Sequence, residues 1–90
     1  MNTNLILNDF LNKLKSEKEA VKNRLQNIDF DNTTREDIDE QFIYPFRNKY
    51  IFTVPDNIVN NVQLSGICVT ECINAYLEIC DCLNNLRKSS

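Results

Sequence analysis

The residues best suited to metal or redox chemistry are four cysteines, at positions 68, 72, 80 and 82 of the 90-residue chain. Since the chain has no histidine, a zinc ion would need these four thiolates, with help from a carboxylate such as Asp81. On one continuous helix, Cys72 and Cys80 would lie about 12 Å apart along the axis, whereas the sulfur ligands of one zinc lie within roughly 4 Å of each other. The spacing therefore predicts no metal and no cofactor. We expect small buried thiols, with Cys82 the most reactive.

Catalytic chemistry has few candidate groups. Without histidine, the chain lacks the Ser-His and Cys-His pairs that activate a nucleophile. The carboxylates of Glu36, Asp37, Asp39 and Glu40 could form an acid–base pair, but acidic side chains are also favoured at a solvated helix start. Gly66 is the single glycine, so no glycine-rich loop is present to bind phosphate. The sequence predicts that the protein is not an enzyme.

A cluster of five aromatic residues lies within positions 42–52, with two basic residues among them. These rings could be the plug of a small core, or a protein-binding patch, since Tyr and Arg are frequent interface anchors. They could also stack on bases of a nucleic acid or clamp a nucleotide, although two basic residues beside an acidic helix are few for that purpose. The candidate partner-binding residues of this region are Glu36, Asp37, Glu40, Tyr44, Phe46, Arg47, Lys49 and Tyr50.

The first element that must position these groups is a helix over residues 4–27. Its apolar residues are spaced alternately by four and three, as in a heptad seam, and no glycine or proline interrupts it. Lys18 lies on this seam, where its charge could extend outward or could set the register against a partner helix.

The middle of the chain is expected to hold a short acidic helix and an aromatic strand. Thr33 with Glu36, or Thr34 with Asp37, would form a capping box at the start of a helix over 34–42. Residues 50–54 have high strand propensity, so 42–54 is expected to form a strand or hairpin, or else an extended arm. Pro45 would confine a pairing strand to a sheet edge.

The last element is a predicted helix over 57–87, which has a second four-three seam. A further stripe of Ile73, Leu77 and Cys80 widens its apolar face, and Gly66 could bend the helix or let another backbone approach. Two helices cannot cover this face, so we expect the aromatic segment and a second chain to do so. The expected oligomer seam is Leu7, Leu11, Leu14, Val21, Leu25, Val69, Tyr76, Ile79 and Leu83.

The fold expected from these elements is mainly α, with a minor β hairpin or strand. It is a single domain over 1–90, built on a long antiparallel helical hairpin with coiled-coil-like seams, and it forms a homo-oligomer. The net charge of −3 argues against nucleic acid as a partner. No apolar run is long enough to span a membrane and no signal peptide is evident, so a cytoplasmic location with reduced thiols is expected.

The expected function is non-enzymatic protein binding. The chain would oligomerise through its helices and would bind a larger partner protein, with or without inhibiting it, through its acidic helix and aromatic segment. Small asparagine-rich chains without motifs are often accessory products of phages, viruses or plasmids, including factors directed against host defences. The alternative function is nucleic-acid or nucleotide binding through the aromatic and basic segment 42–54.

Overall fold

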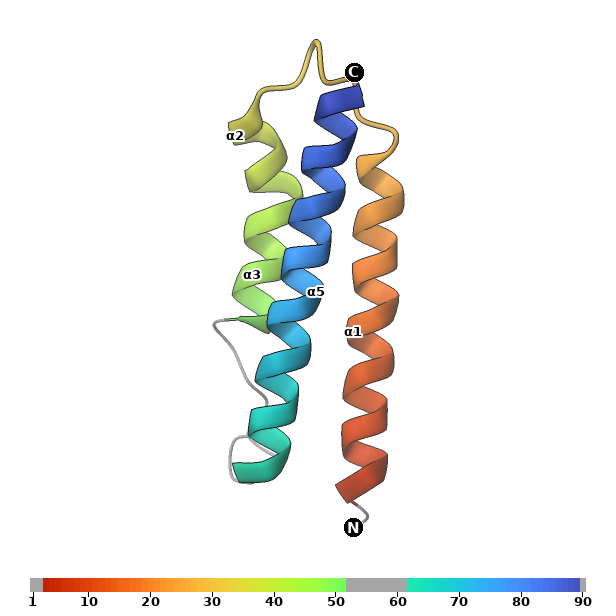
Figure 1. Cartoon of the computed structure of the whole chain (residues 1–90), viewed down its shortest axis with the longest axis vertical. Coiled ribbons are helices and arrows are strands. Elements are labelled where there is room, and N and C mark those ends of the chain that lie inside the picture. Colours follow the sequence, from red (N-terminus) through yellow and green to blue (C-terminus); the bar gives the residue numbers. More distant parts are fainter. Residues whose placement is uncertain (1–2, 52–61, 90) are drawn as a thin grey trace.

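The computed structural model describes residues 3–51 and 62–89, and every regular element within these ranges is helical (Figure 1). Helix α1 spans Thr3–Leu25 and helix α5 spans Val62–Ser89. Between them lie α2 (Arg35–Ile38), the π-helical turn η1 (Asp39–Ile43) and α3 (Tyr44–Tyr50), which follow one another without a break. We refer to residues 35–50 as the middle segment.

Three helical rods lie side by side in an elongated molecule of 49 × 18 × 15 Å. Ile6 and Phe10 near the start of α1 pack against Cys68 near the start of α5, and Lys22 near the end of α1 reaches Glu78 of α5. The two long helices therefore run in the same direction. The middle segment runs in the opposite direction, from the end of α1 back toward the start of α5 (Figure 1). Near the end of α1, the guanidinium of Arg24 lies over the ring of Phe42 in the middle segment.

The packing of α1 beside α5 agrees with the sequence-based prediction of two long packed helices. The antiparallel relationship is found between consecutive segments, because α1 and α5 both run opposite to the middle segment. This arrangement has three helical rods in place of the two-helix hairpin that we expected. It follows from the middle segment, which is long enough to carry the chain back along α1 before α5 begins.

The predicted strand or hairpin over 42–54 is wrong for residues 42–51, which are helical or in a turn; residues 52–54 lie outside the described residues. The buried side chains at 42, 43, 46 and 50 recur at helical spacing. A strand would instead place Phe42, Tyr44 and Phe46 on one face, yet Tyr44 is exposed. Burial against two long helices thus outweighs the strand propensity of aromatic residues.

A π turn allows the middle segment to remain helical through Pro45. Proline has no N–H to donate, and its ring clashes with the carbonyl four residues earlier in a regular α-helix. The N–H of Tyr44, just before the proline, donates to the carbonyl of Asp39, five residues back. We attribute the wider turn to the space that the ring of Pro45 needs.

The start of the middle segment decides between the two expected capping residues. Thr34 Oγ1 accepts a hydrogen bond from the Asp37 N–H at 3.1 Å, so Thr34 is the N-cap of α2. The acidic side chains of Glu36 and Asp37 lie in this first turn, where the helix dipole favours them.

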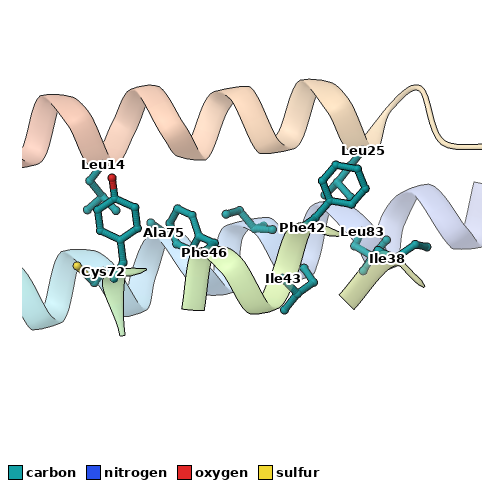
Figure 2. Packing of buried hydrophobic residues seen from close by; sticks show 11 residues of the cluster. Leu14, Leu25, Ile38, Phe42, Ile43, Phe46, Cys72, Ala75 and Leu83 are labelled. Carbon is teal, nitrogen blue, oxygen red and sulfur yellow. The ribbon is translucent and has the colours of Figure 1, made fainter. Parts of the chain in front are cut away.

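The core lies along the shared axis of the three rods, and each rod supplies part of it (Figure 2). The rings of Phe46 and Tyr50 lie 4.8 Å apart between α1 and α5, and Phe10 meets Tyr50 edge-on at 6.0 Å. The aromatic segment is therefore largely a core plug. The buried residues of the main cluster are Leu14, Leu25, Ile38, Phe42, Ile43, Phe46, Tyr50, Cys72, Ala75, Ile79 and Leu83.

Candidate interaction surfaces

The structure divides the predicted partner-binding residues into exposed and buried groups. The rings of Phe46 and Tyr50 are buried in the core, and Arg47 is half-buried. The remaining five are exposed along the middle segment: Glu36, Asp37, Glu40, Tyr44 and Lys49. Acidic and aromatic groups are thus available to a partner from Glu36 to Tyr44, but two of the predicted contact rings are not.

Neighbouring side chains hold the exposed groups of the middle segment in place. The guanidinium of Arg47 lies 4.4 Å from the centre of the Tyr44 ring, a cation–π geometry. Arg35 Nε donates to Asp39 Oδ1 at 2.9 Å, one turn away. Lys49 forms an ion pair with Glu17 of α1. The middle segment is therefore joined to α1 at its surface as well as through its core residues.

The predicted oligomer seam is occupied mainly within the chain. Leu14, Leu25, Ile79 and Leu83 are buried, so they are not available to a second chain while this fold persists. The reason is the third rod, which continues as a helix through residues 42–50, where a strand or hairpin was predicted. Four further seam residues, namely Leu7, Leu11, Val21 and Tyr76, are half-buried, and Val69 is the exposed one.

A row of large aliphatic side chains remains uncovered on the outer side of α5. Val69, Ile73 and Leu77 are 43%, 44% and 53% exposed, and their spacing of four places them on successive turns of one side of the helix. We call these three residues the α5 strip. Ile73 and Leu77 belong to the second stripe seen in the sequence, but sequence reasoning did not identify them as site residues. Which stripe stays uncovered depends on where the middle segment packs.

The inner border of the α5 strip faces the middle segment. Tyr76 and Cys80 are half-buried there, with Arg47 and Asp39 near enough to Tyr76 to act on the pKa of its phenol, which burial raises above its usual value. The strip thus lies beside Tyr76 and Arg47, residue types that are enriched at the energetically dominant positions of protein interfaces.

The four cysteines of α5 are buried or half-buried, as apolar side chains at these positions would be. Burial raises the pKa of the Cys72 thiol to about 11 and also raises that of Cys68, and both side chains are buried. Cys80 and Cys82 are half-buried, and all four are free thiols. Within residues 3–51 and 62–89, no group of three or more Cys, Asp or Glu side chains is arranged to hold a metal ion.

A hollow of about 330 Å³ between α1 and α5 is one concave feature that could hold a ligand. Its lining combines Lys15 and Lys18 with Glu71 and Glu78, and Lys18 Nζ lies 2.7 Å from Glu78 Oε2. Cations and carboxylates are balanced in this lining, so it offers no concentrated charge to an ionic ligand.

Across the described part of the chain, no helix is both long enough and apolar enough to cross a membrane. No protein-family model, curated protein or solved structure matches this chain.

Proposed function

We propose that the protein is a non-enzymatic protein-interaction module that associates through its helices and binds a larger partner protein. The observation that carries this proposal is the α5 strip, where Val69, Ile73 and Leu77 stay exposed although the core beneath them is filled. Contiguous exposed apolar side chains with polar borders are typical of protein-binding surfaces.

A second surface, which lies on the middle segment, is suited to binding the larger partner. Glu36, Asp37 and Glu40 are exposed, and Tyr44 at their end is exposed with Arg47 against its ring. A partner with a basic surface would pair with these carboxylates, which would accelerate and orient association, and the tyrosine would supply apolar contact. Where that surface is a working part of the partner, binding would inhibit it. The proposal includes inhibition of this kind by an accessory protein of a phage or plasmid, acting in the cytoplasm.

Nucleic-acid or nucleotide binding has less support as a second candidate. Stacking on bases needs accessible rings, but Phe46 and Tyr50 are buried between the helical rods. The accessible ring of this group, Tyr44, already has the Arg47 guanidinium over it, and exposed carboxylates of the same segment would repel phosphates. We therefore retain the protein-interaction proposal alone.

The proposal can be tested by affinity capture from extracts of the cells in which the protein is naturally made. The double variant Glu36→Lys/Glu40→Lys reverses the charge of the acidic surface. Asp9→Lys is the control for charge reversal, because Asp9 is also exposed but lies on α1. We expect at least one protein to be retained by the wild type and by Asp9→Lys and to be lost with the double variant. Retention of one identical set of proteins by all three would contradict the proposal.

A further inference from the structure

The α5 strip carries no charge, and this distinguishes it from the other exposed surfaces. Its three members are aliphatic, and Thr70 beside them is neutral. The nearby Glu71 and Asn74 belong to the lining of the hollow that faces α1. Although each copy of this chain has a net charge of −3, the strip itself adds no like charges to a contact between two copies, whereas two copies meeting at Glu36 and Glu40 would bring carboxylates together.

The spacing of the strip is self-complementary. Val69 and Leu77 lie one turn before and one turn after Ile73, on the same side of α5. If two α5 helices cross antiparallel with Ile73 at the two-fold axis, Ile73 meets the partner's Ile73 and Val69 meets the partner's Leu77. Each contact is then made twice, which is the defining property of an isologous dimer interface.

The antiparallel direction is favoured by the residues on either side of the strip. A parallel pairing would bring Asp81 against the partner's Asp81, and like charges would oppose each other. The antiparallel pairing places Asp81 near the partner's Ser65, which is neutral. Gly66, two turns before Ile73 on this side of α5, has nothing within 4 Å of where a Cβ would lie. Its missing side chain serves no described contact inside the chain and would let a second backbone come close.

We propose that the α5 strip pairs with the strip of a second copy in an antiparallel, two-fold arrangement centred on Ile73. This inference rests on the proposed interaction function and names the partner of one of its surfaces. Three partly exposed aliphatic side chains per copy fall well short of the roughly 800 Å² per partner that a standard interface buries. We therefore expect a weak dimer, with a dissociation constant of roughly 10 µM to 1 mM.

The test is sedimentation velocity on the purified full chain over a concentration series that spans this range. Ile73→Glu places two carboxylates together at the two-fold axis and should weaken association by roughly tenfold or more. Ile67→Glu is the matched control, because Ile67 is the same residue type on the same helix, with an equal exposure of 44%, and lies outside the strip. Circular dichroism would verify that both variants keep the helical content of the wild type.

We expect association in the wild type and in Ile67→Glu, and its loss in Ile73→Glu. A wild type that remains monomeric throughout, or an Ile73→Glu variant that associates as the wild type does, would overturn the inference. If capture from extract still depends on Glu36 and Glu40 in that case, the proposed binding of a larger partner stands and the dimer alone fails.

Thiol crosslinking tests the direction of pairing. In a chain with Cys80→Ala and Cys82→Ala, Val69→Cys and Leu77→Cys are each treated with a short thiol-to-thiol crosslinker, alone and as an equimolar mixture. The antiparallel arrangement predicts crosslinked dimers in the mixture and few with either variant alone. Crosslinking of each variant to itself, with none between them, would show parallel pairing and contradict the proposed geometry.

Discussion

The ammonium nitrogen of Lys18 in α1 lies 2.7 Å from a carboxylate oxygen of Glu78 in α5, at the middle of both long helices. The sequence left two roles open for Lys18 on the α1 seam, namely an outward-extended charge or a register-setting contact with a partner helix. The structure shows the second type of contact, but with a helix of the same chain. Lys22, one turn further along α1, binds the other oxygen of Glu78 at 3.0 Å, so one carboxylate joins two turns of α1.

We expect Glu78→Gln to lower the free energy of unfolding by about 0.5–1 kcal/mol, because these charges are partly solvated and pairs of this kind contribute little more. The measurement is urea denaturation at low and high salt, and the difference should shrink at high salt. Asp9→Asn is the control, since the Asp9–Lys13 pair is far more exposed and should change stability by less than about 0.3 kcal/mol. Equal losses in the two variants would contradict the bridging role of Glu78.

The same carboxylate predicts a pH dependence of stability. Hydrogen bonds from Lys18 and Lys22 hold the pKa of Glu78 below its ordinary 4.5. Since the pKa is lower in the folded state, the stabilisation is present above the unfolded pKa and is lost as pH falls through the folded value. The difference in unfolding free energy between the wild type and Glu78→Gln should be constant near pH 7, and it should shrink and vanish as the pH falls from 4.5 through the lowered pKa of Glu78. A difference that persists in acid would contradict this assignment.

Truncation of Ile79 and of Leu77, which lie two positions apart on α5, should lower the stability of the fold by different amounts. Ile79 is fully buried in the core, so Ile79→Ala should lower the free energy of unfolding by about 2–4 kcal/mol. Leu77 belongs to the α5 strip, so Leu77→Ala should cost less than about 1 kcal/mol in dilute solution. Chemical denaturation at low protein concentration measures both. A larger loss for Leu77→Ala would place the strip inside the monomer core.

The thiols should differ in reactivity toward a disulfide reagent at pH 8. Cys72 is buried and its pKa is raised to about 11, so little thiolate forms and the reagent cannot reach it in the folded chain. We expect Cys82, which is half-buried, to account for the fastest phase. Cys82→Ser should remove that phase and Cys72→Ser should leave it, as followed by the release of the coloured thiolate. Removal of the fast phase by Cys72→Ser would contradict the burial of that residue.

The two long helices could be predicted because their four-three spacing continues for many turns without a breaker. The start of the middle segment could also be predicted, from its capping threonine and the acidic residues of its first turn. The helical state of residues 42–50 could not, because their aromatic residues suit a strand in isolation and become helical only through burial between α1 and α5. Because no third rod was expected, the predicted direction of α5 relative to α1 was also wrong. A heptad seam carries no information on helix direction, so only a third rod shows that α1 and α5 run the same way. The candidate surface could not be predicted for the same reason, since the position of that rod decides that Ile79 is covered and Ile73 is not.

The measurement that tests the account most directly is the mass of the purified full chain at a concentration of about 1 mM, the upper end of the expected dissociation constant. The account predicts that the wild type and Ile67→Glu sediment as a mixture of one and two folded chains. Ile73→Glu, with a charge in the α5 strip, should sediment as the monomer. A wild type that is wholly monomeric at this concentration, or an Ile73→Glu variant that associates as the wild type does, would contradict the claim that this face of α5 is a binding surface.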